Sequence, residues 1–336
     1  MIKIVLALII GISIISVPAK AQRSQFKISK VFRIASGGGW DYLAINNDKL
    51  YVSHGTQVNI LNKNSGDSIG VIENTPGVHG IAFVKSLSKG YISDGRTNNV
   101  TVFDLKTNKI LGQIPTGENP DAIMYDDFSK KIFTCNGRSK DMTVINPEID
   151  KVIKTIALGG KPETAVSDET GKLYINIEDK NEIAQVNTST FKVERRWSIS
   201  PGEGPTGLAY DKETKKLFAG CDKLLVISDV SQGKVIAKIP IGEGCDGVAF
   251  DRSSKNIFTA NGEGTLTVIH EDGANNYKVL ENTATKRGAR TIALDERTHR
   301  LYLPTAEFEP AIATNTEKSE RPKMIPGTFQ VLVIEK

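Results

Sequence analysis

Charged and polar side chains recur at one position of a repeat that runs through most of the 336-residue chain. The position lies just ahead of a short run of alternating or β-branched residues, and successive copies are 38, 42, 42, 43, 40 and 44 residues apart. It is occupied in turn by Asp41, His79, Asp121, Glu163, Thr206, Asp246 and Arg290. Carboxylates beside an imidazole and a guanidinium are suited to binding a polar ligand or to moving protons. We therefore take these seven positions as the first candidates for a functional site.

The repeat itself predicts the structure that positions these side chains. Its clearest copy spans residues 117–158 and contains four short runs with alternating or β-branched character, separated by Asp, Asn, Gly and Lys. Such runs are typical of strands joined by hairpins, and none has the spacing of an amphipathic helix. A lone four-stranded meander cannot bury both faces, so copies at a period of 40 to 45 residues must stack on one another. The sequence predicts an all-β fold, a seven-bladed β-propeller of four-stranded antiparallel blades.

The two ends of the chain predict how the ring closes. The seventh repeat has strands near residues 290–295, 300–304 and 329–335, and one strand is missing when the chain ends. The segment 26–35 matches the pattern of a fourth strand. We expect it to pair with residues 329–335, which removes the sheet edges that an open ring exposes.

The second strand of each repeat carries a tetrad that aligns around the chain. The tetrads are YVSH from Tyr51, YISD from Tyr91, FTCN from Phe133, YINI from Tyr174, FAGC from Phe218, FTAN from Phe258 and YLPT from Tyr302. On these motifs, from about Phe26 to the C-terminus, the chain resembles the YVTN-repeat family of β-propellers. YINI, FAGC and YLPT depart most from the family's tetrad. The resemblance implies the propeller fold, whereas the family includes binding, scaffold and enzyme-associated domains and single-stranded nucleic-acid binders.

In a propeller, the loops before first strands and after second strands lie on one face, around the mouth of the central channel. The recurring charged position is expected to form one ring there. A second ring is expected from His54, Asp94, Asn136, Ile177, Cys221, Asn261 and Thr305. We further expect Trp40 to offer a stacking surface beside Asp41, and Arg96 and Arg138 to lean over the mouth near Asp121. A water-filled funnel of such groups focuses the electric field and so favours a polar ligand. The alternative is that these groups only form hydrogen bonds with water and with the backbone of neighbouring blades.

Local motifs for known chemistry are missing from the sequence. It has no C-x-x-C-H, H-E-x-x-H, G-x-x-x-x-G-K or D-x-D-x-D-G pattern. The G-x-S-x-G match at residues 66–70 falls in a predicted hairpin at the outer rim, not in the strand-to-helix turn of a nucleophile elbow. Because a seven-fold ring spreads its residues, we expect no metal site, and no cofactor can be named.

The N-terminus predicts export. Lys3 is followed by an apolar run at 4–17 and by the triplet Ala-Lys-Ala at 19–21, the pattern of a cleaved signal peptide of residues 1–21. An uncleaved anchor is the alternative, but the run is shorter than the roughly 20 residues of a membrane span. A mature chain beginning at Gln22 has a net charge of +2, too balanced for a dedicated nucleic-acid binder. We expect a monomeric periplasmic or extracellular protein with one propeller domain, residues 22–336, and no transmembrane segment.

Three cysteines are too few to build a disulfide scaffold. Cys221 ends a second strand and Cys245 precedes the next first strand, so in an oxidising compartment we expect these two to form a bridge. We expect Cys135 to remain a buried free thiol. A proline-containing stretch at 307–326 interrupts the seventh repeat, and we expect a long loop that is either a lid or a solvated insert.

These features favour a non-enzymatic binding or scaffold propeller that recognises a small polar ligand or a partner protein at the channel mouth. The candidate ligand-binding residues are Trp40, Asp41, His79, Arg96, Asp121, Arg138, Glu163, Asp246 and Arg290. One alternative is a lyase or lactonase in which axial carboxylates and His79 transfer protons. Another is single-stranded nucleic-acid binding through Trp40 and the arginines.

Overall fold

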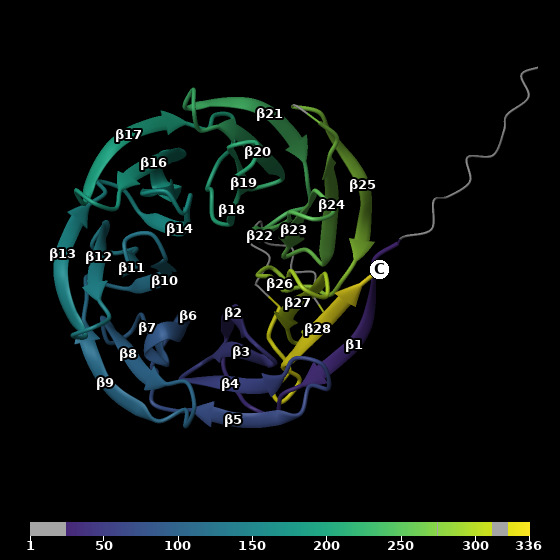
Figure 1. Ribbon diagram of the computed structural model, residues 1–336. Coiled ribbons are helices and arrows are strands. Elements are labelled where there is room, and N and C mark those ends of the chain that lie inside the picture. The colour runs from purple at the N-terminus through teal and green to yellow at the C-terminus, as the bar shows by residue number, and fades with distance from the viewer. Residues whose placement is uncertain (1–24, 274, 311–321) are drawn as a thin grey trace, which may run out of the picture.

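A computed structural model describes residues 25–273, 275–310 and 322–336. These residues form seven four-stranded antiparallel sheets arranged in a ring, as Figure 1 shows. The helices among them are the single 3₁₀ turns η1 (Lys85–Leu87) and η2 (Glu178–Lys180). The predicted all-β, seven-bladed propeller is confirmed. The predicted signal peptide, residues 1–21, lies outside the described residues.

Each blade is a meander whose first strand faces the axis and whose fourth strand faces the rim. Blade 1 contains β2 (Trp40–Asn46), β3 (Lys49–His54), β4 (Gln57–Asn62) and β5 (Ser68–Ile72). Blade 2 contains β6 (Val78–Val84), β7 (Lys89–Asp94), β8 (Asn99–Asp104) and β9 (Ile110–Pro115). Blade 3 contains β10 (Pro120–Asp126), β11 (Lys131–Asn136), β12 (Asp141–Asn146) and β13 (Lys151–Ala157).

The next three blades repeat this order. Blade 4 contains β14 (Pro162–Ser167), β15 (Lys172–Ile177), β16 (Glu182–Asn187) and β17 (Lys192–Ser198). Blade 5 contains β18 (Leu208–Asp211), β19 (Lys216–Cys221), β20 (Leu224–Asp229) and β21 (Lys234–Pro240). Blade 6 contains β22 (Cys245–Asp251), β23 (Asn256–Asn261), β24 (Thr265–Glu271) and β25 (Tyr277–Ala284).

Blade 7 is assembled from both ends of the chain. It contains β26 (Ala293–Asp295), β27 (Arg300–Thr305), β28 (Gln330–Glu335) and β1 (Lys27–Arg33). β1 pairs antiparallel with β28, from Lys27 opposite Glu335 to Arg33 opposite Gln330. The predicted closure by the N-terminal strand is confirmed, and Figure 1 shows the C-terminus beside β1 at the rim.

Polar hairpins explain why the chain turns where it does. Several turns between first and second strands start at an aspartate whose carboxylate accepts a hydrogen bond from a residue three positions later. The aspartates are Asp126, Asp211, Asp251 and Asp295, and the donors are Ser129, Thr214, Ser254 and Thr298. Such side-chain bonds mimic a backbone turn and end the first strand.

The recurring tetrads explain how each blade is held internally. Their aromatic first residues are buried between blades. In blade 3 the tetrad ends in Asn136, whose Nδ2 donates to Asp141 Oδ1 at 2.7 Å and to Thr143 Oγ1 at 2.8 Å in the third strand. Asn261 makes the same pair of bonds to two threonines of β24 in blade 6. A buried amide therefore ties the second strand to the third.

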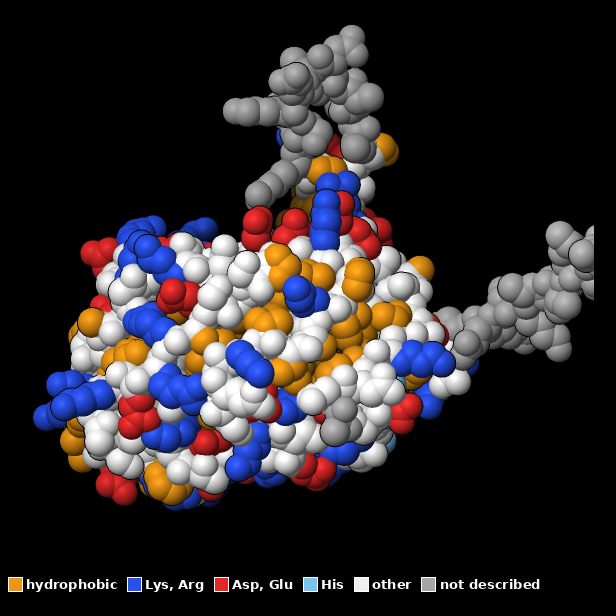
Figure 2. Space-filling model, turned by 90° about the horizontal axis from the view of Figure 1, so that it is seen from above, with side chains coloured by type: hydrophobic (Ala, Val, Ile, Leu, Met, Phe, Trp, Pro, Cys, Tyr) orange, Lys and Arg blue, Asp and Glu red, His pale blue; other side chains and the backbone are white. Residues whose placement is uncertain are grey.

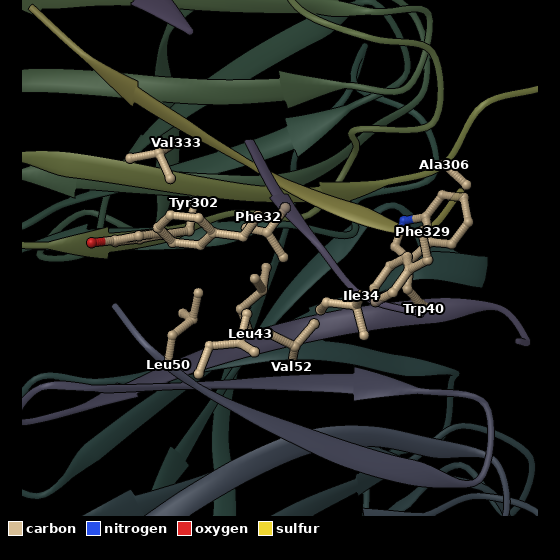
Figure 3. Packing of buried hydrophobic residues seen from close by; sticks show 12 residues of the cluster. Phe32, Ile34, Trp40, Leu43, Leu50, Val52, Tyr302, Ala306, Phe329 and Val333 are labelled. Atoms are coloured by element: carbon tan, nitrogen blue, oxygen red, sulfur yellow. The ribbon is translucent and has the colours of Figure 1, made fainter. Parts of the chain in front are cut away.

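Apolar clusters between neighbouring blades form the core, and the cluster between blades 7 and 1 shows how closure is stabilised. Phe32 of β1 and Ile34, two residues further along the chain, point toward Leu43 and Val52 of blade 1 in Figure 3. Phe32 also packs on Tyr302, with ring centroids 6.4 Å apart. Full burial of side chains of this size contributes roughly 1.5–3 kcal/mol each.

A buried ion pair adds to this junction. Lys63 Nζ, just after β4, lies 2.6 Å from the Asp295 carboxylate at the end of β26. The hydroxyl of Tyr302 donates to the Lys63 carbonyl at 3.0 Å. The pair therefore connects blade 1 to blade 7 through charges that water does not reach.

The predicted Cys221–Cys245 disulfide is wrong, because both residues are free and buried. Cys245 Sγ lies over Gly220, where an added Cβ would come within 2.6 Å of the sulfur. Successive residues of a strand point to opposite faces, so Cys221 points away from Cys245, toward blade 4. Cys135 is free and buried, as predicted.

Figure 2 views the rim of the disc, where hydrophobic side chains lie between charged ones. Between β27 and β28, Phe308 and Met324 of the described residues form an isolated antiparallel bridge. Residues 311–321 of the predicted 307–326 loop lie outside the described part of the chain. Among the described residues, no helix is long and apolar enough to cross a membrane.

Candidate ligand site at the channel mouth

Bulges in the innermost strands position the first ring of candidate residues. In blades 1 to 4 and 6, the pairing of the first strand with the second shifts near its start. The residues within these shifts include Asp41, His79, Asp121, Glu163 and Asp246. A bulge bends the strand and re-aims its side chains. In this propeller it turns the charged side chains toward the axis and toward one another.

Asp41, His79 and Asp121 come together although they belong to three consecutive blades. His79 Nδ1 lies 2.6 Å from Asp41 Oδ2 and 3.9 Å from Asp121 Oδ1. One ligand atom from each residue lies within 4.8 Å of the other two. The side chains are partly buried, at 26% exposure for His79 and 16% for each aspartate. The structure therefore brings together residues that a seven-fold ring was expected to keep apart.

Two further acids of the ring have basic partners. Lys161 Nζ lies 2.7 Å from Glu163 Oε1 and also contacts Glu178. Arg290 Nε donates to Asp246 Oδ2 at 2.7 Å, joining blade 7 to blade 6. Among the described residues, Asp121 has one ion pair within 4.0 Å. It is the contact to His79, which at 3.9 Å is longer than the contact between His79 and Asp41. Asp121 is thus the acid of the ring with the least compensated charge.

Burial and mutual repulsion shift the protonation of the cluster. Burial by itself lowers the pKa of His79, but the hydrogen bond to Asp41 and the negative charges of Asp121 and Glu163 raise it to about 9. Burial raises the pKa of Asp121, and the charge of Asp41 adds to this rise while that of His79 opposes it. At neutral pH the imidazole is therefore protonated, and a full negative charge on Asp121 is costly unless another cation approaches.

A small cavity lies directly behind the ring on the innermost strands of blades 1 to 4, with a volume of about 160 Å³. It is lined by Tyr42, Leu43, Gly80, Ile81, Ala122, Ile123, Met124, Thr164 and Ala165. Burial raises the pKa of Tyr42 well above its usual value, and the charge of Asp121 raises it further. Its phenol is thus a neutral donor at the floor of the mouth.

Trp40 does not offer the stacking surface that was predicted. The side chain is buried, with 9% exposure, and packs on Phe329 and Phe308 at centroid distances of 5.6 and 6.1 Å. Its Nε1 donates to the Gly288 carbonyl at 3.3 Å. Trp40 is therefore part of the blade 7 to blade 1 core, because an indole at the start of β2 gains more by burial there than by facing water.

The second predicted ring does not line the mouth, because its seven residues are fully buried inside the blades. His54 illustrates the reason: its Nε2 donates to the Gly38 carbonyl at 2.9 Å, and its Nδ1 is hydrogen-bonded to Ser36 Oγ. Its ring stacks on Phe329 with centroids 3.7 Å apart. In blade 2, Asp94 Oδ2 accepts from Thr101 Oγ1. These positions serve blade packing.

Arg96 and Arg138 are exposed in the turns between the second and third strands of blades 2 and 3. Neither makes a side-chain hydrogen bond or ion pair with another described residue. The structure therefore does not bring them to Asp121 within bonding distance.

Two residues of the mouth, Lys161 and Tyr42, were not predicted from the sequence, although the repeat contains a signal for each. Lys161 lies two positions before Glu163, where the other repeats have Gly or Asn. Tyr42 lies one position after Asp41, where the other repeats have Gly, Ala or Thr. Both residues can be recognised because each places a large or charged side chain where the other copies of the repeat have a smaller uncharged residue.

The fold defines the chain as a seven-bladed β-propeller with a charged channel mouth. Residues 37–200, which include blades 1 to 4, match the family model described as "Domain of unknown function (DUF5074)". No curated protein matches the chain in sequence.

Solved structures resemble the chain in fold. A chain of Kuenenia stuttgartiensis hydrazine synthase is 13% identical with a TM-score of 0.69, over 85% of this chain and 95% of that chain. A chain of the mitotic checkpoint complex is 13% identical with a TM-score of 0.70, over 90% of this chain and 95% of that chain. At such identity the likeness shows the propeller fold alone, since one fold supports many functions.

Proposed function

We propose that the chain is an exported propeller of the YVTN-repeat type that binds a small, positively charged ligand at the mouth of its central channel. The observation that supports this is the position of Asp121, which shares the mouth with three other acids. Among the described residues its one ion pair within 4.0 Å is the 3.9 Å contact to His79, which is already paired with Asp41. A cation there offsets the burial and the repulsion by Asp41 that together raise the pKa of Asp121.

The cavity behind the ring limits the size of the ligand. About 160 Å³ corresponds to roughly five water molecules. Tyr42 and the aliphatic residues around it contribute both a hydroxyl group and an apolar wall. The cavity is thus suited to a compact cation.

The protonation of His79 favours binding over proton-transfer catalysis. A general base must be unprotonated at the working pH, whereas the pKa of His79 is raised to about 9 by its pairing with Asp41 and its acidic surroundings. Accepting a proton from a substrate would first require the loss of the ion pair with Asp41. His79 is therefore unsuited to be the base of the lyase or lactonase alternative, which would leave that role to the axial carboxylates.

A thermal-shift screen of the chain beginning at Gln22 tests the proposal. The panel contains small amines, guanidinium compounds and divalent metal salts, with sugars, lactones and oligonucleotides as other classes. A cation at 100 times its Kd should stabilise the protein by about 2.7 kcal/mol. The shift should disappear in Asp121→Asn and persist in Asp127→Asn, an exposed acid of the same blade.

Two results contradict the proposal. One is a panel in which no cation shifts the melting temperature, which would leave a protein partner as the remaining reading. The other is equal stabilisation of wild type and Asp121→Asn, which places the site elsewhere. An oligonucleotide shift that disappears with added salt would instead support the nucleic-acid alternative.

A further inference from the structure

The donor atoms at the mouth resemble a coordination sphere more closely than an amine pocket. His79 offers Nδ1, and Asp41 and Asp121 each offer a carboxylate oxygen, all within 4.8 Å of one another. Among the described residues this is the one group of three such side chains with that spacing. One nitrogen and two oxygen donors are a ligand set that first-row transition metals accept.

We infer that the cation bound at the mouth is a divalent transition-metal ion held by Asp41, His79 and Asp121. The inference rests on the proposed function and names its ligand class. Zn²⁺ lies about 2.0–2.2 Å from His and carboxylate donors, which sets the donors of a tetrahedral site roughly 3.3–3.6 Å apart. His79 Nδ1 is 2.6 Å from Asp41 and 3.9 Å from Asp121, and all three donors lie within 4.8 Å of one another, so side-chain shifts on the order of 1 Å admit the ion.

The backbones that carry the ligands are held in place by neighbouring blades. Thr291 Oγ1 of blade 7 donates to the Asp41 carbonyl at 2.6 Å. Ser93 Oγ accepts from the Gly80 amide at 2.8 Å and donates to the Asp121 carbonyl. Such supporting bonds orient ligands before a metal arrives.

The fit around the imidazole is equally specific. A Cβ at Gly95 would lie 2.7 Å from His79 Nε2, so glycine at this position makes room for the ring. A divalent ion that displaces the proton of His79 leaves a neutral imidazole and two carboxylates around it, so the site has no net charge. The bound ion therefore removes the repulsion between the two carboxylates and leaves no uncompensated charge in the partly buried site.

Another histidine of the chain provides a matched control. His299 Nδ1 lies 2.9 Å from Asp251 Oδ2, which reproduces the His79–Asp41 contact. No second carboxylate joins that pair into a group of three within the described residues. His299→Gln therefore removes a His–Asp pair without removing the proposed site.

Isothermal titration of EDTA-stripped protein with Zn²⁺ and Co²⁺ tests the inference. We expect one ion per chain, with a visible Co²⁺ spectrum, and a loss of more than about 100-fold in affinity in His79→Gln. His299→Gln should bind as wild type does. Asp41→Asn should also weaken binding, because it removes one of the three donors.

His79 also separates a metal ion from an organic cation. Replacing the imidazole takes no partner from an amine that binds the carboxylates, whereas a metal ion loses one of its three donors. Amine binding with no metal binding overturns the inference and leaves the proposed function standing. If neither an amine nor a metal ion binds, both the inference and the proposed function are overturned.

Unchanged metal affinity in His79→Gln, or a loss in His299→Gln, also overturns the inference. If His79→Gln does not fold, ¹⁵N NMR of the wild-type imidazoles on zinc addition decides. A shift confined to the ring nitrogens of His79 supports the site, and unchanged His79 signals overturn it.

Discussion

The ammonium group of Lys63 lies 2.6 Å from the carboxylate of Asp295, joining the first blade to the last with exposures of only 2% and 5%. Burial alone raises the pKa of Asp295, but its bonds to Lys63 and Thr298 outweigh this and lower it. The ion pair is therefore a specific element of ring closure, added to the apolar cluster around it.

Lys63→Met should destabilise the protein by about 3–5 kcal/mol, because it leaves a buried carboxylate without its cation. Urea unfolding monitored by circular dichroism measures the change. Lys130→Met, which breaks an exposed pair with Asp127, is the control and should change stability by less than about 1 kcal/mol. Equal effects of the two substitutions would show that Lys63 does not hold the ring.

Removal of β1 should open the ring. A chain that begins at Ser36 loses the buried side chains of Phe26, Phe32 and Ile34 and leaves β28 as an unpaired edge. The loss should exceed about 5 kcal/mol. The control is the chain beginning at Gln22, and a synthetic peptide of residues 25–35 should restore part of the lost stability. A truncated chain with an unchanged melting midpoint would contradict the closure.

Asp94→Asn should stabilise the protein. Asp94 Oδ1 and the neighbouring Asn99 Oδ1 are buried acceptors without a donor. An amide at position 94 can donate to Asn99 and to Thr101, which reproduces the network that Asn136 makes in blade 3. Satisfying such groups contributes about 1–2 kcal/mol.

The gain from Asp94→Asn should depend on pH. Burial raises the pKa of Asp94 to about 7, although the hydrogen bond from Thr101 lowers it. Since the folded pKa lies above the unfolded value of about 3.9, the native state binds the extra proton. The stability that this proton contributes is present below pH 4 and lost as the pH rises through 7. Urea unfolding at pH 5 and pH 8 should therefore show the larger gain at pH 8, and a larger gain at pH 5 would contradict it.

Gly207→Ala should disturb the contact between the innermost strands of blades 5 and 6. An added Cβ would lie 2.7 Å from the Val248 amide nitrogen and 2.9 Å from Gly247 Cα, which are backbone atoms that cannot rotate away. We expect a loss of about 1–3 kcal/mol.

Gly112→Ala is the matched control for Gly207→Ala, because Gly112 lies in β9 with no atom within 4 Å of an added Cβ. It should be neutral or stabilising by about 0.4–1 kcal/mol. The melting temperatures of the two variants, measured by calorimetry, test both expectations. An unchanged melting temperature in Gly207→Ala would show that blades 5 and 6 can move apart there.

The fold could be predicted from sequence because its determinants are local and repeated. Strand alternation, hairpin residues such as Asp126 and Asp251, and the aligned tetrads act within a single blade. Seven copies make the signal additive. The closing strand was found for the same reason, since residues 26–35 match the fourth strand of the other blades.

The orientation of side chains across blades was not accessible from the repeat alone. Cys221 and Cys245 are near in the repeat frame, yet adjacent positions on β19 face opposite blades, so the two thiols point apart. Trp40 directly precedes a channel residue and is nevertheless buried in the core.

By itself, the sequence determined that Asp41, His79 and Asp121 belong to one ring, because a regular period assigns each to the same level of a blade. Only the tertiary structure decided that they meet, since the bulges at the starts of β2, β6 and β10 turn them toward each other from separate blades. Periodicity specifies a position along the chain. It does not specify the direction of a side chain at a bulge, where strand alternation is interrupted by contacts with the next blade.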